Sequence, residues 1–148
     1  MKRIVIVALT LLCALPLGAQ SVSKSDFEGN WVSVDDVTNQ RKSEITIYVE
    51  NGKLYGQISR LLLEEDQGKL CVECKGAKKN QPIEGLTIIE GLEWDGEAWT
   101  DGKILDPANG KQYSCTLTLE DPTTLNVRGY LGISLLGRTQ TWYKQAKK

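Results

Sequence analysis

The sequence contains no histidine. This absence excludes Ser-His-Asp and Cys-His catalysis, zinc and haem sites with histidine ligands, and an imidazole charge switch near neutral pH. The chain also has no run of about 20 apolar residues, the length that a membrane-spanning helix needs. It has no basic stripe that could neutralise the phosphates of a nucleic acid. The sequence therefore predicts no catalytic site, no metal site, no cofactor and no nucleic-acid partner.

The remaining composition is that of an ordinary globular protein. The 148 residues are 41% hydrophobic and 25% charged, with a formal net charge of −1. These values exclude a disordered chain, a collagen and a coiled coil. At this length one folded domain is expected.

The first twenty residues have the organisation of a secretory signal peptide. Met1-Lys2-Arg3 is basic, residues 4–17 are almost wholly apolar, and the small residues Gly18 and Ala19 follow. Fourteen apolar residues are too few to cross a bilayer. We expect cleavage after Ala19, and the alternatives are an uncleaved anchor or a lipid-attached Cys13. A cleaved chain has no transmembrane segment and is exported, to the periplasm or the extracellular space.

Cleavage would leave residues 20–148 as a single domain. The loss of Lys2 and Arg3, with no acidic residue, changes the net charge from −1 to −3. Such a mild negative charge favours no particular class of partner.

The mature part alternates between tight turns and strands. Asx-Gly pairs, which suit type I′ hairpin turns, stand at 51–52, 95–96, 101–102 and 109–110. Between turns the apolar residues recur with period two, as in Ile45, Ile47 and Val49, which indicates antiparallel strands with one buried face. Eight strands are predicted, at about residues 30–36, 43–50, 53–62, 86–94, 97–105, 111–120, 123–131 and 137–145.

No segment shows a sustained helical pattern, so no crossover helices are expected. The predicted fold class is all-β, a single antiparallel up-and-down meander of about eight strands that closes into a barrel. Asp95-Gly96 and Asp101-Gly102 stand too close for both to end hairpins. The second pair is therefore predicted to be a β-bulge, which puts Trp99 and Ile104 on the same face of their strand.

Three cysteines remain after cleavage. Cys71-Val72-Glu73-Cys74 lies in a long polar loop, about residues 64–84, and in an oxidising compartment this pair favours a local disulfide. A catalytic redox pair and a zinc site are the alternatives. The redox pair is disfavoured because no helix pattern follows the motif, and the zinc site lacks a fourth ligand. Cys115 shares an apolar face with Leu117 and is expected to be a buried free thiol, and the alternative is a disulfide between Cys74 and Cys115.

The two ends of the predicted barrel carry complementary residues. Gly29-Asn30-Trp31 opens the first strand and Arg138 lies in the last, and these strands are neighbours in a closed barrel. The Arg138 guanidinium is expected to lie across the Trp31 indole and to close the barrel by a cation–π contact. This arrangement resembles the lipocalin or calycin plan, with Gly-x-Trp near the start and a basic residue late. The resemblance implies a lipocalin-like barrel.

Several further blocks, in this order, resemble one bacterial family, the domain of unknown function 2147. The blocks are Gly29-x-Trp31, Gly52-x-Leu54-Tyr55-Gly56-x-Ile58, Cys71-x-x-Cys74, Gly85-Leu86-x-Ile88, Trp99-x-x-Gly102-x-Ile104, Asp106-Pro107-x-x-Gly110-Lys111-x-Tyr113, Leu125-x-Val127-Arg128-Gly129-Tyr130-x-Gly132 and Gly137-Arg138-Thr139-x-x-Trp142. They cover about residues 29–143. The resemblance implies an exported small β-barrel protein and carries over no catalytic residue.

Five residues are candidates for ligand binding: Tyr55, Asp106, Arg128, Tyr130 and Trp142. Arg128 and Tyr130 lie two apart on one strand, on the face opposite Val127, where they can grip a carboxylate or a sugar edge. Asp106 precedes a turn and can pair with Arg128 or Lys111. The aromatic side chains of Tyr55 and Trp142 can line a pocket mouth. The alternative is that all five are surface or packing residues.

Three functions remain open. The first is an exported envelope protein that binds a small hydrophobic, lipid-like or anionic ligand without catalysis. The second is a structural or protein-interaction module of the cell envelope, with an unidentified protein partner. The third is a thiol-disulfide redox protein that uses Cys71 and Cys74.

Overall fold

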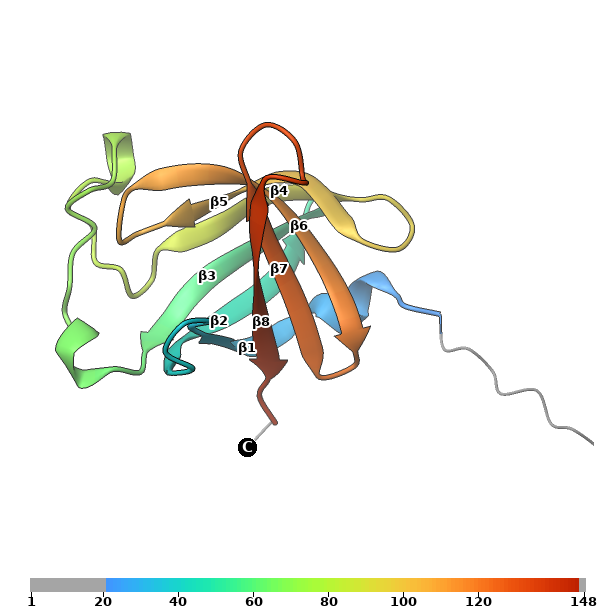
Figure 1. The fold of residues 1–148 in the computed structure, drawn as a ribbon, viewed down its shortest axis with the longest axis horizontal. Helices are drawn as coiled ribbons and strands as arrows, with labels where there is room; N and C mark the ends of the chain where they lie inside the picture. The colour runs from blue at the N-terminus through green and yellow to red at the C-terminus, as the bar shows by residue number, and fades with distance from the viewer. Residues whose placement is uncertain (1–20, 147–148) are drawn as a thin grey trace, which may run out of the picture.

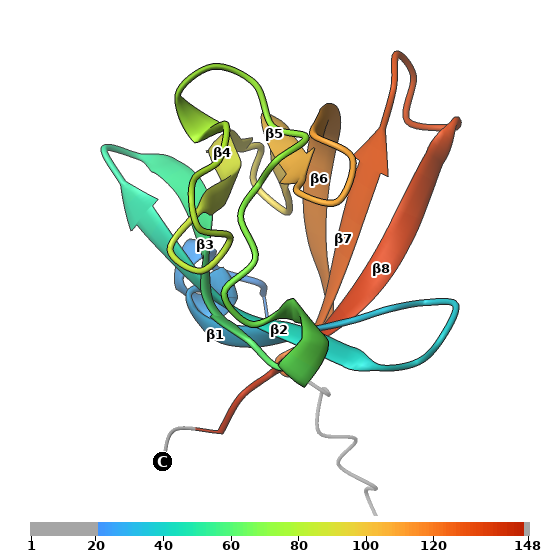
Figure 2. The same ribbon diagram turned by 90° about the vertical axis from the view of Figure 1, so that its left-hand side faces the viewer.

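The protein is a closed barrel of eight antiparallel strands in chain order (Figures 1 and 2). The computed structural model describes residues 21–146, so the predicted signal peptide, residues 1–19, lies outside the described residues. The strands are β1 (Gly29–Val34), β2 (Arg41–Glu50), β3 (Lys53–Leu61), β4 (Thr87–Trp94), β5 (Trp99–Asp106), β6 (Lys111–Asp121), β7 (Thr124–Tyr130) and β8 (Gly137–Lys144). The predicted all-β meander is confirmed.

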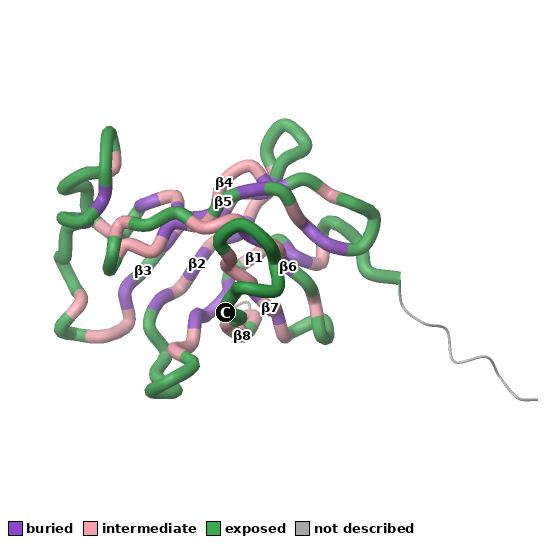
Figure 3. Tube along the Cα trace, turned by 45° about the horizontal axis from the view of Figure 1, so that its top comes forward, coloured by how far each residue is buried: buried purple, intermediate pink, exposed green. Residues whose placement is uncertain are grey.

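Strand β8 returns to pair with β1 and closes the barrel. Trp31 lies opposite Lys144, and Ser33 lies opposite Trp142. Closure removes the unpaired strand edges that an open meander would expose. Buried and exposed residues alternate along the strands (Figure 3), as the period-two pattern predicts. Among the helices of the described part, none is long and apolar enough to span a bilayer.

The predicted bulge in β5 is confirmed. The register between β5 and β6 shifts between Trp99 and Gly102, and Asp101 has a positive φ of 59°. Because of this shift, Trp99 pairs with Leu117 and Ile104 with Tyr113, which are both inward positions of β6. The bulge therefore keeps Trp99 and Ile104 on the same face of β5, as predicted.

The two ends of the barrel are built differently. In a meander, connections alternate between the ends, so the β1–β2, β3–β4, β5–β6 and β7–β8 loops share one end. We call this the open end. The other end, which we call the closed end, carries the remaining turns and a 3-10 helix, η1 (Lys24–Phe27), at the right of Figure 1.

Aromatic side chains fill the closed end. Phe27 of η1 is fully buried, and its ring meets Trp94 edge-on at 5.6 Å between centroids. Trp94 lies in turn 5.5 Å from Trp99. The Nε1 of Trp31 donates a 2.8 Å hydrogen bond to the carbonyl oxygen of Phe27. This bond fixes η1 across the end of the barrel and gives the buried indole its polar partner.

The cation over the Trp31 indole is Lys144, and the predicted contact with Arg138 is wrong. The Lys144 Nζ lies 5.0 Å from the ring centroid and donates a 2.7 Å hydrogen bond to the carbonyl oxygen of Asp26. Arg138 stands at the other end of β8, where it pairs with Asp36. The extended strand separates the two basic residues by about 20 Å. Trp31 is at the closed end, so it meets the cation that ends β8.

We expect Lys144→Met to lower the free energy of unfolding by about 1–3 kcal/mol, measured by urea denaturation. The change removes the cation–π contact and leaves the carbonyl of Asp26 without its donor. Arg138→Met is the matched control, because its ion pair is exposed and contributes little to stability. A larger loss in Arg138→Met than in Lys144→Met would contradict this assignment.

Candidate ligand-binding cavity

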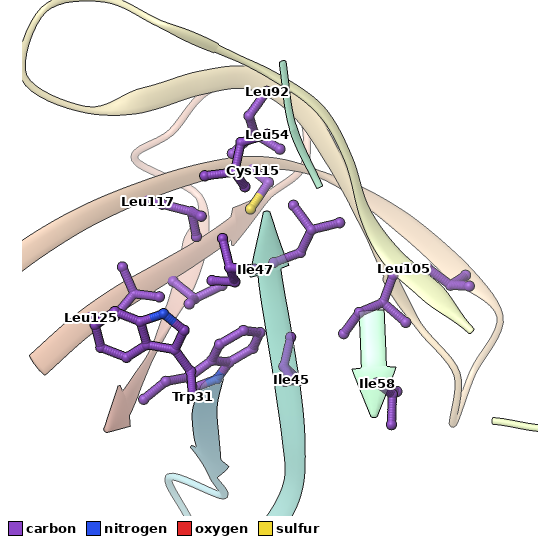
Figure 4. Close-up of a cluster of buried hydrophobic side chains, with 14 of the residues drawn as sticks. Trp31, Ile45, Ile47, Leu54, Ile58, Leu92, Leu105, Cys115, Leu117 and Leu125 are labelled. Carbon is purple, nitrogen blue, oxygen red and sulfur yellow. The ribbon is translucent and has the colours of Figure 1, made fainter. Parts of the chain in front are cut away.

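The closed half of the barrel is filled with side chains. Figure 4 shows Trp31, Ile47, Leu117 and Leu125 packed together around the barrel axis, with the Cys115 thiol beside them. Cys115 is buried and free, as predicted, and burial raises the pKa of its thiol to about 12. A thiol held protonated in an apolar core is unreactive.

The open half of the barrel holds a cavity of about 850 Å³. Its wall is formed by inward-facing residues at the open-end halves of the strands. These residues are Ser33, Ser43, Ile45, Ile58, Ile104, Tyr113, Val127, Gly129, Gln140 and Trp142. Gly129 leaves this wall without a side chain, and Trp142 lies deeper on β8, between the cavity and the filled half.

A few polar groups interrupt the apolar wall. The hydroxyl oxygens of Ser33 and Ser43 lie 2.7 Å apart, and the Ser33 hydroxyl accepts a 3.2 Å hydrogen bond from the Ser43 backbone N–H. The Trp142 Nε1 donates a 3.3 Å bond to the Gln140 side-chain oxygen. An apolar cavity with a few placed polar groups is the usual form of a small-molecule site.

Charged groups stand at the rim. Arg138 lies opposite Gly129 in the β7–β8 register, on the inward side of β8, and lines the cavity. Its Nε donates a 2.7 Å hydrogen bond to the Asp36 carboxylate, and its Nη2 makes a second bond. This pairing holds the pKa of Asp36 below its usual value. Across the opening, the Asp106 carboxylate accepts bonds from Ala108 N–H and Asn109 Nδ2 and so fixes the β5–β6 turn.

Comparisons with known proteins agree with this architecture. Residues 29–144 match a family of bacterial proteins described as uncharacterized protein conserved in bacteria (DUF2147). The chain belongs to this family. Among solved structures, HP1028 of Helicobacter pylori superposes with a TM-score of 0.71 at 17% sequence identity, over 80% of this chain and 82% of that one. HP1028 is described as a member of the lipocalin family. No curated protein matches the sequence.

At 17% identity the likeness to HP1028 shows the fold alone. It confirms the predicted lipocalin-like barrel, and the DUF2147 match confirms the family to which the sequence blocks point. The closed end of this DUF2147 protein carries the Gly-x-Trp of β1 and a late basic residue, which is Lys144.

Three of the five predicted ligand residues line the cavity: Asp106, Tyr130 and Trp142. Tyr55 does not, because it alternates with Leu54 and Gly56, which pair with inward positions of β4. Its ring instead stacks on Tyr48 at 5.8 Å, on the outside of the β2–β3 hairpin.

Arg128 also lies outside the cavity. It occupies the face of β7 opposite Val127, as the alternation predicts, but its guanidinium is already engaged. It donates to the carbonyl oxygen of Ser134 and to the Thr139 hydroxyl rather than to Asp106. The predicted pairing of Arg128 with Asp106 is therefore wrong, and Arg128 orders the β7–β8 loop.

Sequence reasoning missed the polar residues of the wall, Ser33, Ser43 and Gln140. The signal was present, because Ser33 is two residues from Trp31 and Gln140 two residues from Trp142 on the same strand faces. A polar residue on the inward face of the open half marks a cavity, whereas the fully buried residues on that face of the filled half are apolar. The missing information was which half is filled.

The β3–β4 loop, residues 62–86, crosses part of the open end (Figure 2). It contains the short 3-10 helices η2 (Glu64–Asp66) and η3 (Gly76–Lys78), and it adds Lys69, Leu70, Val72 and Ile83 to the cavity lining. This loop limits access to the cavity from one side.

The predicted disulfide is present, and it joins Cys71 to Cys74 within this loop. Both cysteines are buried, and the Cys71 Sγ lies 3.5 Å from the carbonyl oxygen of Pro107 in the β5–β6 turn. Thiol-disulfide exchange requires that an incoming thiolate reach a sulfur atom. The burial of this disulfide therefore favours a structural role in fixing the loop.

The disulfide segment packs closely on Gly110, which has a positive φ of 68°. A Cβ atom at this glycine would lie 1.9 Å from the carbonyl oxygen of Glu73. No side chain fits there unless the loop backbone moves. Gly110 thus sets how closely the β3–β4 loop approaches the barrel.

We expect Gly110→Ala to displace the loop and to speed amide hydrogen exchange of residues 69–83 by about tenfold or more, while β6 and β7 stay protected. Gly52→Ala is the matched control. Gly52 has a similar positive φ of 79°, but nothing lies within 4 Å of its added Cβ. If Gly52→Ala sped up amide exchange of residues 69–83 as much as Gly110→Ala does, then backbone strain at a glycine, and not contact with Glu73, would be the cause of the faster exchange.

Proposed function

We propose that this protein is an exported binding protein that holds one small, mainly apolar ligand in the open half of its barrel. The observation that carries the proposal is the cavity of about 850 Å³ behind the β3–β4 loop. Sites for small molecules usually have volumes of about 300–1,000 Å³. An eight-stranded barrel holds either its own side chains or one small ligand, and this barrel has room for both, in separate halves.

The distribution of polarity orients the ligand. Ile45, Ile58 and Val127 surround the inner part of the cavity, whereas Arg138 and Tyr130 stand at the rim. An acyl chain would lie inward, with its polar end at the mouth. A carboxylate there would share Arg138 with Asp36, because a guanidinium has five donors. The ligand class that fits best is therefore a single-chain amphipathic lipid or a molecule of similar shape.

Export is part of the proposal. The basic and apolar start of the chain favours it. A disulfide within the β3–β4 loop is also expected of a protein that matures in an oxidising compartment.

The test is native mass spectrometry of the protein purified from the envelope of the cell that makes it, followed by titration with a fluorescent polyene fatty acid. We expect one bound molecule per chain and saturable binding of the probe. The mass of the chain also shows whether residues 1–19 have been removed. The proposal is wrong if the protein carries no small molecule and the probe does not bind.

A second candidate function, an interaction module of the envelope, is favoured by one observation. The β7–β8 loop exposes several large apolar side chains, the usual mark of a docking surface. In that case a protein would co-purify in fixed stoichiometry, and filling the cavity would not affect its binding.

A further inference from the structure

The open end is unusually apolar on its outside. Most large apolar side chains that are exposed within residues 21–146 lie in its loops: Val37, Leu70, Val72, Leu131, Ile133, Leu135 and Leu136. The β7–β8 loop carries the densest group. Leu131, Ile133, Leu135 and Leu136 are 58%, 61%, 83% and 70% exposed. The surface of a soluble protein rarely exposes four aliphatic side chains in one short loop unless that loop has a function.

The loop also carries no charge. No acidic or basic residue occurs from Gly129 to Gly137. The nearest cations are Arg128 and Arg138, which flank the loop on β7 and β8. An uncharged, aliphatic tip between flanking cations is suited to an apolar phase bounded by polar headgroups.

Arg128 donates hydrogen bonds to the backbone carbonyl groups of this loop. Its Nε donates a 2.9 Å hydrogen bond to the carbonyl oxygen of Ser134, and its Nη2 reaches the carbonyls of Ser134 and Leu135. The Leu136 N–H donates a 3.1 Å bond to the carbonyl of Ile133. A loop that enters an apolar phase must satisfy its backbone groups internally, whereas water would satisfy them on an ordinary surface loop.

The loop adjoins the cavity. Leu131 and Leu136 line it, together with Leu70 and Val72 of the β3–β4 loop. Ile133 does not line it and, like Leu135, is turned to the outside. The same loop therefore forms one wall of the opening with two of its aliphatic residues and projects the other two away from it.

We propose that the open end docks on a lipid bilayer, with the side chains of Ile133 and Leu135 inserted into the interfacial region. The inference rests on the proposed function, because docking would let an apolar ligand pass between bilayer and cavity without crossing water. A second copy or a protein partner on this face would instead block the opening. A protruding loop also suits a deformable lipid phase better than a flat protein surface.

The experiment measures flotation with phosphatidylcholine vesicles. It compares the wild-type protein, purified from the cell that makes it, with the double variant Ile133→Ser/Leu135→Ser, which we call the loop variant. The matched control is Val22→Ser/Tyr143→Ser, which also replaces two exposed apolar side chains, away from the open end. We expect the loop variant to lose about tenfold or more in vesicle affinity, and the control to bind like the wild type. Phosphatidylglycerol should add little, because the two flanking cations are already engaged, Arg128 with the carbonyl of Ser134 and Arg138 with the Asp36 carboxylate.

A second variant tests the role of Arg128. Arg128→Leu adds apolar surface but leaves the carbonyls of Ser134 and Leu135 without their donor. We expect weaker vesicle binding, whereas tighter binding would show that apolar area alone matters and would overturn this role of Arg128.

Binding of the polyene fatty acid distinguishes this proposal from the previous one. Ile133 and Leu135 do not line the cavity, so the loop variant should bind the probe like the wild type. Equal vesicle binding by wild type and loop variant would overturn docking and leave the ligand site intact. A dimer in solution that the loop variant dissociates, without vesicle binding, would assign the loop to a second copy of this chain. Loop-dependent vesicle binding without probe binding would overturn only the cavity function.

Discussion

Gly129→Phe is expected to weaken binding of the polyene fatty acid strongly while the barrel stays folded. Gly129 lines the cavity on β7 with a backbone conformation open to any residue. An added Cβ would lie 3.5 Å from Ile104 Cγ2 and 3.6 Å from Tyr113 Cβ, which are ordinary contacts. The phenyl ring would therefore project into the space that the acyl chain needs. We expect a loss of affinity of about tenfold or more in a fluorescence titration.

Gly129→Ala provides the control for this experiment. A methyl group makes the same first contacts but leaves most of the cavity empty, so probe affinity should change little. Circular dichroism of both variants reports whether the barrel has formed. If a folded Gly129→Phe variant bound the probe like the wild type, the ligand site would have to lie elsewhere.

Trp31→Ala is expected to lower the free energy of unfolding by about 3–5 kcal/mol, the usual cost of removing a buried Trp side chain. The Trp31 indole is fully buried. It also holds the carbonyl of Phe27 through Nε1 and receives the Lys144 cation on its ring. Its removal opens a void at the closed end and releases η1. Urea denaturation measures the effect, which approaches the whole stability of a small domain.

Trp31→Phe separates packing from hydrogen bonding. A phenyl ring keeps much of the apolar volume but cannot donate to the Phe27 carbonyl, so we expect an intermediate loss of about 1–3 kcal/mol. A Trp31→Phe variant as unstable as Trp31→Ala would mean that the hydrogen bond, and not the packing, holds the closed end together.

The strand pattern was predictable because it depends on neighbouring residues along the chain. Ile45, Ile47 and Val49 alternate with polar residues in a way that only a strand with one buried face satisfies. Even the bulge in β5 was predictable, since two Asx-Gly pairs cannot both end hairpins within eight residues. The Cys71–Cys74 disulfide belongs to the same class of local prediction, because its loop contains only two residues.

The errors concern pairings between distant residues. Arg138 and Lys144 both lie on the inward side of β8, so the alternation is equally consistent with either of them lying beside Trp31. The choice depends on which end of the barrel holds Trp31, a property of the closed sheet. Arg128 was assigned a ligand because nothing in the sequence shows that Ser134 folds back to accept its hydrogen bonds.

The sequence by itself determined the meander, the inward and outward sides of several strands and the small disulfide loop, because each depends on periodicity or on contacts within a few residues. Closure was predictable as well, since an open meander of eight strands would leave two unpaired edges. Only the tertiary structure decided that one half of the barrel is filled and the other empty. Aromatic rings from η1, β1, β4 and β5 converge on one end, whereas Gly129 and small polar residues leave the other end open. That division depends on how side-chain volumes from distant strands add up in space, which no local pattern records.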